Sequence, residues 1–182
     1  EIADLASLSK IAKEAGVLFV VDNVYCTPVL QKPLEYGADV VVHSATKYLD
    51  GQGRCVGGAL VVNDRALYDE LFNTLRTSGP SMSPFNAWVF QKGLETLALR
   101  MKGHCEYAAE LADWLQGHPA VRRVFYPGLS SHPGHLLALK QQRGFGGIVA
   151  FEIHGSRSDA WQIIDHTRLL SITANLGDSK ST

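Results

Sequence analysis

This sequence of 182 residues has few cysteines, no large excess of charge of either sign and no long apolar run. The three cysteines, Cys26, Cys55 and Cys105, are widely spaced and form no Cys-x-x-Cys pair, which argues against a disulfide framework or a zinc site. We therefore expect a reducing, cytoplasmic location. The 17 basic and 18 acidic side chains leave a net charge of −1, which gives no electrostatic reason to expect nucleic acid or a membrane surface as partner.

The two ends of the sequence lack the features of a complete chain. No initiator methionine precedes Glu1, and the basic start and apolar run of a signal peptide are absent. No run of about 18 apolar residues occurs, so we expect no segment that crosses a bilayer. The first residues already lie inside an amphipathic pattern, and the last ones close no element. We expect a fragment of a longer protein.

Apolar runs and helical spacing alternate along the first half of the chain, which predicts an α/β fold. Residues 3–15 have the spacing of a helix that Gly16 would end. Three apolar runs follow, at 17–22, 39–43 and 58–62, and their continuous character is typical of strands buried in a parallel sheet. Because ligands bind at the carboxyl ends of such strands, we expect Asp22 and the turn 44–47 to share one crevice.

The second half is predicted to be more mixed. A long helical stretch covers about 84–115, with weak interruptions at Gly93 and Gly103. Strands are expected at 121–126 and 147–153, and a further helix at 157–167. We place a domain boundary near residue 93, which divides the chain into 1–93 and 94–182.

Lys47 is the strongest candidate for a reactive group. A lysine beside an apolar run is usually a surface residue whose amine reaches water. Here, however, Ser44 and Thr46 precede it in the same turn. Hydroxyl and backbone N–H groups in a turn can hold a phosphate, while a partly buried lysine can form a Schiff base with an aldehyde.

Asp22 ends the apolar run before this turn and has two interpretations. It could cap the following turn through its side chain. Alternatively, it could pair with a protonated pyridine nitrogen, which is the usual role of an aspartate in a pyridoxal-phosphate site.

Several motifs together resemble the transsulfuration family of pyridoxal-phosphate enzymes of cysteine and methionine metabolism. The resemblance covers nearly the whole chain and is carried by Val21-Asp22-Asn23, Thr27-Pro28, Gly37–Tyr48, Arg76, Gly79, Ser83-Pro84, Asn86-Ala87-Trp88, Gly93–Leu97 and Arg100-Met101.

The resemblance implies the fold of the aspartate-aminotransferase type, fold type I, and pyridoxal 5′-phosphate as cofactor. It implies that Lys47 is the Schiff-base lysine and proton shuttle, that Asp22 pairs with the pyridine nitrogen, and that Ser44 and Thr46 contact the phosphate. It places Asn175 beside the substrate carboxylate. A homotetramer with shared active sites is also implied, and the chain corresponds to the later part of the large domain and the beginning of the small C-terminal domain.

Departures from the commonest family pattern predict the substrate. Val24 stands where many relatives have threonine, Gly51-Gln52-Gly53-Arg54 replaces Gly-His-Ser-Asp, and Asn175-Leu176-Gly177 replaces Ser-Leu-Gly. This combination is most similar to sulfhydrylases that act on O-succinylhomoserine. The expected reaction is γ-replacement, which turns O-succinylhomoserine and sulfide into homocysteine and succinate in methionine biosynthesis. Cystathionine γ-synthase chemistry and cystathionine or methionine γ-lyase chemistry are the alternatives, and an inactive isolated fragment is the non-enzymatic one.

Other motifs carry weaker hypotheses. Ser44-x-x-Lys47 also fits the pattern of serine acyl transferases, but their Ser-Asp-Asn and Lys-Thr-Gly motifs are absent. His132-Pro133-Gly134-His135 is interpreted as a polar turn rather than a metal site. Cys26 is expected to act as a small buried hydrophobic residue. Arg54 either forms a surface ion pair or faces the entrance of the active site.

Overall fold

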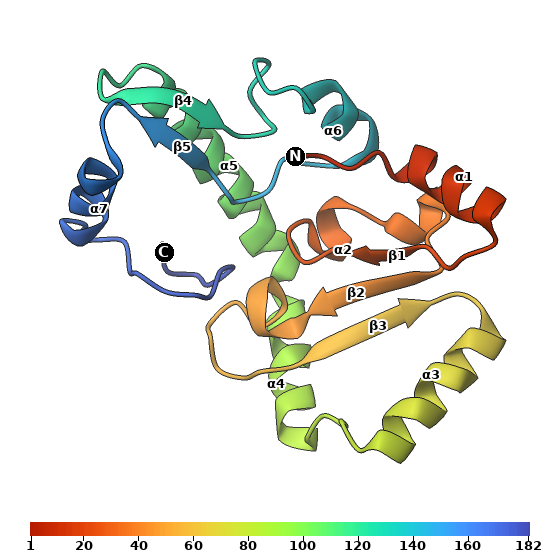
Figure 1. Cartoon of the computed structure of the whole chain (residues 1–182). Helices are drawn as coiled ribbons and strands as arrows, with labels where there is room; N and C mark the ends of the chain where they lie inside the picture. Colours follow the sequence, from red (N-terminus) through yellow and green to blue (C-terminus); the bar gives the residue numbers. More distant parts are fainter.

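The computed structural model describes all residues from 1 to 182 as two β-sheets with helices packed around them (Figure 1). In chain order the elements are α1 (Leu5–Ala15), β1 (Val20–Asp22), α2 (Thr27–Leu30), η1 (Pro33–Tyr36), β2 (Val40–Ser44), η2 (Ala45–Leu49), β3 (Gly58–Val62), α3 (Arg65–Ser78), α4 (Pro84–Glu95), α5 (Leu97–Gln116), β4 (Val121–Phe125), α6 (His135–Gln141), β5 (Ala150–Ile153) and α7 (Arg157–Asp165).

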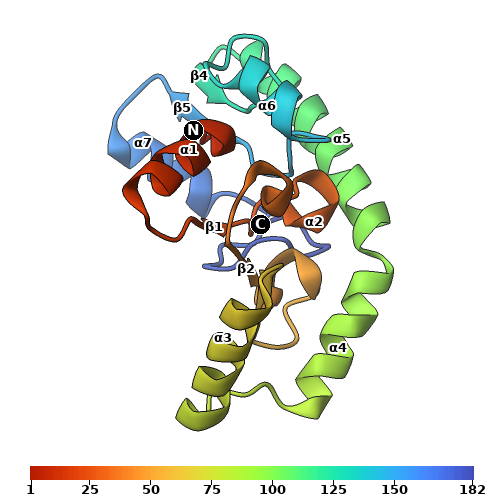
Figure 2. The ribbon, with the colours of Figure 1, turned by 90° about the vertical axis from the view of Figure 1, so that its right-hand side faces the viewer.

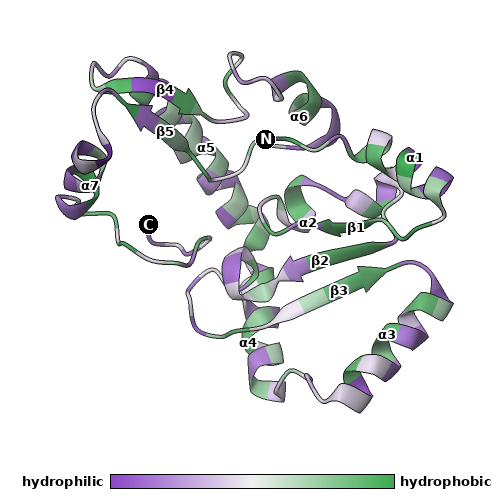
Figure 3. Cartoon of the chain, viewed as in Figure 1, coloured by the Kyte–Doolittle hydropathy of each residue, from purple (hydrophilic) through white to green (hydrophobic).

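The first sheet has the strand order β1-β2-β3. Strands β1 and β2 are parallel, with Asp22 opposite Val42. Strand β3 runs antiparallel to β2, so the prediction of three parallel strands is wrong for β3. A continuous apolar run does not distinguish the two directions, and an antiparallel edge strand on a parallel sheet is common. Figure 3 shows the hydrophobic strands β2 and β3, with β2 turning hydrophilic at its carboxyl end.

Helix α1 packs on this sheet as its sequence predicts. The Asp4 side chain accepts a hydrogen bond from the backbone N–H of Ser7 at the start of the helix, and Gly16 ends it with a φ of 66°. Leu5 of the helix joins a buried cluster with Val21 and Val41 of the strands. This packing fixes the strands whose ends carry the candidate site.

The long helical stretch consists of two helices, α4 and α5, which lie end to end along one side of the molecule (Figure 2). They meet at Thr96, whose φ of −108° and ψ of 0° are not helical. The predicted interruptions at Gly93 and Gly103 are wrong, because both glycines lie inside regular helix. At the break, the Gly93 carbonyl oxygen accepts hydrogen bonds from both the N–H and the hydroxyl of Thr96, each at 3.3 Å.

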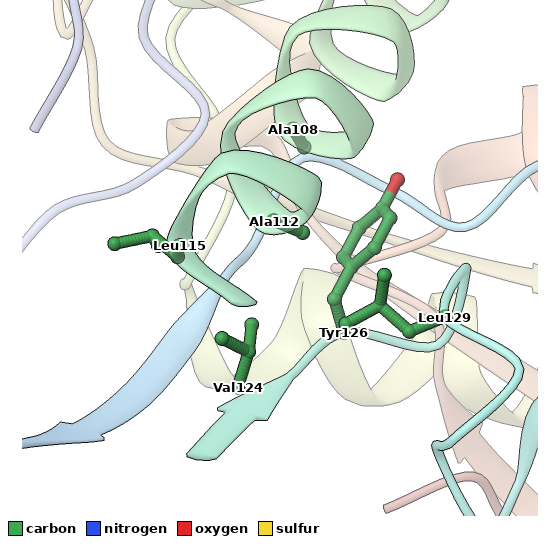
Figure 4. Close-up of a cluster of buried hydrophobic side chains, with 6 residues drawn as sticks. All are labelled: Ala108, Ala112, Leu115, Val124, Tyr126 and Leu129. Atoms are coloured by element: carbon green, nitrogen blue, oxygen red, sulfur yellow. The ribbon is translucent and has the colours of Figure 1, made fainter. Parts of the chain in front are cut away.

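The second sheet pairs β4 and β5 in antiparallel fashion and packs against α5. Its core contains Ala112, Val124 and Tyr126, which Figure 4 shows between the helix and the strands. The buried Tyr126 hydroxyl donates to the backbone oxygens of Cys105 and Gly146, at 3.2 and 3.1 Å. This core is separate from the cluster beneath the first sheet.

Several boundaries differ from those predicted. Strand β1 is shorter than the apolar run 17–22, because Val17 and Leu18 are exposed, and β5 begins at Ala150 rather than 147. Helices α3 and α6 were not predicted as separate elements, and α6 begins at the last residue of the predicted polar turn, His135. No helix in the structure is both long and apolar enough to cross a membrane.

The predicted domain boundary near residue 93 falls inside α4. The division into 1–93 and 94–182 stays a prediction, because a shared helix neither establishes nor contradicts it.

Candidate active site

The carboxyl ends of β1 and β2 lie side by side, because the two strands are parallel. Figure 1 shows both arrowheads pointing toward the loop η2 and the C-terminal segment. Asp22 is the last residue of β1, and Ser44 is the last residue of β2. The structure therefore brings the predicted site residues of the first half to one edge of the sheet, as a ligand crevice of an α/β sheet requires.

Lys47 lies in the middle of η2, a single wide helical turn in which the Asp50 N–H bonds the Ala45 carbonyl oxygen. Its φ of −89° and ψ of −126° are not helical. The half-buried Lys47 amine donates a hydrogen bond of 3.1 Å to Asn175 Oδ1, across 128 residues of sequence. Two candidates from opposite halves of the sequence are thus in direct contact.

Asp22 is placed so that it can both cap its turn and bind a ligand. Its Oδ1 accepts a hydrogen bond of 3.0 Å from the Val24 N–H, which is the turn-capping contact. The other oxygen, Oδ2, has no hydrogen-bond partner within the chain, and the side chain is exposed. The carboxylate can therefore cap its turn and still accept a bond from a ligand.

The two hydroxyls of the turn differ in availability. Ser44 makes no side-chain hydrogen bond within the chain. The Thr46 hydroxyl donates to the Gly57 oxygen at 3.3 Å and accepts from the Gly57 N–H at 3.0 Å. Ser44 is therefore free to bind an anion, whereas Thr46 must give up its bond to the Gly57 oxygen before it can donate to one.

This set of groups fits pyridoxal phosphate. An amine suits the aldehyde, a carboxylate with a free oxygen suits the pyridinium nitrogen, and an unengaged hydroxyl suits the phosphate. Lys47, Asp22 and Ser44 supply these three groups at one sheet edge. The residues present thus match the chemistry of the cofactor.

Next to this edge, His43 is buried and its Nδ1 has no hydrogen-bond partner. Burial lowers the pKa of His43, and the carboxylate of Asp22 acts in the opposite direction. The imidazole is therefore held in its neutral form close to the charged site.

Arg54 forms an ion pair with Asp50, a carboxylate whose side chain is fully buried. Arg54 Nη2 lies 2.7 Å from Asp50 Oδ1, and Arg54 Nε donates to the same oxygen at 2.8 Å. The Arg54 backbone N–H donates to the other oxygen at 2.6 Å. Of the two interpretations of this arginine, the structure supports the ion pair.

Sequence reasoning missed the residues that hold the Lys47 turn in place. Tyr48 is almost fully buried, and burial raises the pKa of its hydroxyl to about 12. A Cβ at Gly177 would lie 2.6 Å from the Tyr48 nitrogen, and one at Gly93 would overlap the Leu49 carbonyl oxygen. Arg100 binds the carbonyl oxygens at the end of the turn. Gly93 and Arg100 belong to the family motifs, but only the structure shows that they contact the turn of Lys47.

Cys26 is partly buried, so the expectation of a small buried hydrophobic residue is met only in part. Burial raises the pKa of Cys26 to about 11, and the nearby Cys105 acts in the same direction. The thiol therefore stays protonated and packs beside the cluster of Leu30 and Tyr48.

The chain matches the family model described as "Cys/Met metabolism PLP-dependent enzyme" over residues 1–182. Among curated proteins, it is 54% identical to O-succinylhomoserine sulfhydrylase of Pseudomonas aeruginosa over 100% of this chain and 45% of that protein. It is 45% identical to cystathionine gamma-synthase of Mycobacterium leprae, over 99% of this chain and 46% of that protein. The chain thus spans about half the length of the relatives it matches.

A solved structure supports the same assignment. Cystathionine gamma synthase from Xanthomonas oryzae pv. oryzae, in complex with aminoacrylate and cysteine, superposes with a TM-score of 0.96 and 42% identity. That match covers 99% of this chain and 46% of the other. The α/β fold is therefore that of fold type I pyridoxal-phosphate enzymes, as predicted, and the chain belongs to the family of pyridoxal-phosphate-dependent enzymes of cysteine and methionine metabolism.

Proposed function

We propose that the full-length protein converts O-succinylhomoserine and sulfide into homocysteine and succinate. The observation that carries this proposal is the 54% identity to an O-succinylhomoserine sulfhydrylase over the whole chain. Identities to the cystathionine enzymes among the relatives reported are lower, at 45% and 42%.

Each candidate residue has a role in this reaction. The bound cofactor supplies an electron sink for charge that develops at the substrate Cα. Lys47 holds the cofactor at rest and, once released, moves the proton at Cα. Asp22 keeps the ring nitrogen protonated through its free oxygen, and Ser44 binds the phosphate, joined by Thr46 when its hydroxyl turns. Asn175 lies beside the substrate carboxylate and, in the structure, holds the Lys47 amine.

The state of Arg54 supports sulfide rather than cysteine as the nucleophile. Cysteine brings an ammonium and a carboxylate, which must be desolvated and paired, whereas sulfide needs only access to Cγ. Arg54 is the nearby cation that could bind a carboxylate, from either cysteine or the succinyl group. Its guanidinium already binds buried Asp50, and removing one partner of a buried pair is costly.

Cystathionine γ-synthase chemistry is the second candidate. It is favoured by the structural neighbour from Xanthomonas oryzae, which was solved in complex with aminoacrylate and cysteine. The same chain residues would serve it, and lyase chemistry needs no second substrate at all.

A competition assay on the full-length protein distinguishes these reactions. The protein is given O-succinylhomoserine with sulfide and cysteine at matched concentrations, and the products are separated and counted. We expect homocysteine to dominate. Dominant cystathionine would replace the proposal by cystathionine γ-synthase, and oxo-acid formation without a nucleophile would replace it by a lyase.

We further propose a cytoplasmic homotetramer with active sites shared between subunits. The three unpaired cysteines support a reducing location. Native mass spectrometry of the full-length protein measures the assembly, and a monomer that retains full activity would contradict it. If residues 1–182 expressed alone give no yellow cofactor adduct, this piece is an inactive part of the subunit.

A further inference from the structure

Arg100 of α5 binds the end of the turn that carries Lys47. Its Nη1 donates to the Tyr48 oxygen at 2.7 Å, and its Nη2 donates to the Leu49 oxygen at 3.5 Å. The same Nη2 donates to the Gly93 oxygen of α4 at 2.8 Å, while Nε donates to the Thr96 hydroxyl at 3.1 Å. One guanidinium therefore joins the turn to the break between the two long helices.

The carbonyl oxygens that Arg100 binds have no backbone partner in the turn. The Asp50 N–H bonds the Ala45 oxygen, and the Gly51 N–H bonds the Lys47 oxygen at 2.9 Å. The carbonyls of Tyr48 and Leu49 are left at the C-terminal end, where every helical turn has unpaired oxygens. A cation there pairs with these oxygens and with the negative end of the turn.

Two glycines allow the backbone around the Arg100 guanidinium to pack closely. Gly93 lets α4 approach Leu49 and Asp50, because a Cβ at Gly93 would overlap the Leu49 oxygen. A Cβ at Gly51 would overlap the Arg100 guanidinium in the same way. The half-buried guanidinium thus lies between the turn and the helix, and its planar fork reaches three carbonyl oxygens at once.

We propose that Arg100 is a positioning residue that fixes the direction in which the Lys47 amine leaves its turn. The Tyr48 carbonyl belongs to the peptide that follows Tyr48, so holding it restricts rotation about the Tyr48 backbone and thereby the orientation of the adjoining Lys47–Tyr48 peptide. This inference rests on the proposed role of Lys47, and Arg100 itself touches neither substrate nor cofactor in it. A displacement of about 1 Å at a reacting group can cost about 100-fold in rate.

The test compares Arg100→Lys and Arg100→Ala in the full-length protein. Lysine keeps the charge but can reach one carbonyl, whereas alanine removes both charge and fork. We expect kcat to fall about 100-fold for Arg100→Ala, with KM near its original value and a smaller loss for Arg100→Lys. Added guanidinium ion should restore part of the rate to Arg100→Ala. Arg122→Ala is the matched control, since Arg122 pairs with Glu152 on the exposed second sheet.

A second readout does not depend on turnover. In the cofactor-free full-length protein, the rate of Lys47 acetylation is measured against that of exposed Lys10 by peptide mapping. We expect the Lys47-to-Lys10 ratio to rise several-fold in the Arg100 variants and to stay constant in Arg122→Ala. If Arg100→Ala does not fold, Arg100→Lys decides the question by the same two measurements.

The outcomes separate this inference from the proposed function. A lowered melting temperature with unchanged kcat and unchanged labelling ratio would show that Arg100 is only structural. An equal change in Arg122→Ala would also overturn the inference. If the unsubstituted protein makes no homocysteine, the proposed reaction fails, yet the labelling ratio still tests Arg100.

Discussion

The two regions that meet at the candidate site are held in different ways. Asp22, Ser44 and Lys47 lie at the ends of paired strands and in a turn whose carbonyl groups are bonded from both sides. Asn175 lies in the irregular segment 171–182, which has no helix or strand. That segment is attached through Gly177 against Tyr48, the Ser179 N–H bonded to the Gly51 oxygen at 2.8 Å, and Asn175 itself.

The difference indicates a division of labour. The candidate cofactor residues stand at strand ends and in a hydrogen-bonded turn, which limits their motion. The candidate substrate residue, Asn175, stands on a loop, where substitutions disturb little else. We therefore expect larger effects from changes in the first region than in the second.

The largest effect is expected for Lys47→Ala. Loss of the amine removes the covalent hold on the cofactor and the group that moves the proton at Cα, so kcat should fall about 10⁴-fold. Borohydride reduction of the loaded full-length protein, followed by peptide mapping, identifies the labelled lysine. Lys10→Ala on the exposed face of α1 is the control, and a label on any other lysine would refute the assignment.

A smaller but still large loss is expected for Asp22→Asn. The amide keeps an oxygen for the Val24 N–H, so the turn survives, but the counter-charge to the ring nitrogen is lost. Exchange of the substrate Cα proton with deuterium from solvent should slow by about 10²- to 10³-fold while cofactor stays bound. Asp64→Asn at the start of α3 provides the matched control. Normal exchange would mean that Asp22 serves only to cap its turn.

A moderate effect is expected for Asn175→Ala in the second region. The variant loses the acceptor for the Lys47 amine and a contact beside the substrate carboxylate, so KM should rise about tenfold. Asn175→Ser, the residue of many relatives, should recover most of the loss. Steady-state kinetics on O-succinylhomoserine measure both. A loss in kcat as large as that of Asp22→Asn would break the comparison between the two regions.

The smallest effect is a loss of stability in mild acid. Burial lowers the pKa of His43, opposed by Asp22, and burial together with Arg100 lowers the pKa of His104. A histidine with a lowered pKa in the folded state binds its proton more readily when unfolded, so stability falls as pH drops below the ordinary value of 6.5.

Urea unfolding of the full-length protein at about pH 7.5 and about pH 5.5 measures this loss. His104→Gln on α5 and His43→Gln on β2 should each reduce the difference between the two midpoints. If neither substitution changes the difference between the two urea midpoints, the loss of stability in acid arises from other groups.

The sequence alone predicted the class of fold, which is confirmed, and a set of candidate cofactor residues, which stays a prediction. Apolar runs that end in polar residues predicted the strands of the first sheet. A buried strand requires an apolar run, and a ligand site at the carboxyl ends of the strands requires polar residues there. The Ser44–Lys47 turn and Asp22 were identified in the same way. Polar and charged side chains beside a buried strand lose contact with water, and a bound ligand can offset that free-energy cost.

Only the tertiary structure decided the rest. The direction of β3 depends on how the loop 51–57 returns, and an apolar run is the same in both directions. The break at Thr96 was missed because Gly93 inside α4 serves close packing against Leu49 rather than bending. The contacts of Lys47 with Asn175, Arg54 with buried Asp50, and Arg100 with the Lys47 turn depend on backbone geometry. A local sequence pattern does not show which carbonyl oxygens remain unpaired in the fold. These unpaired oxygens determine where a side chain such as Arg100 binds.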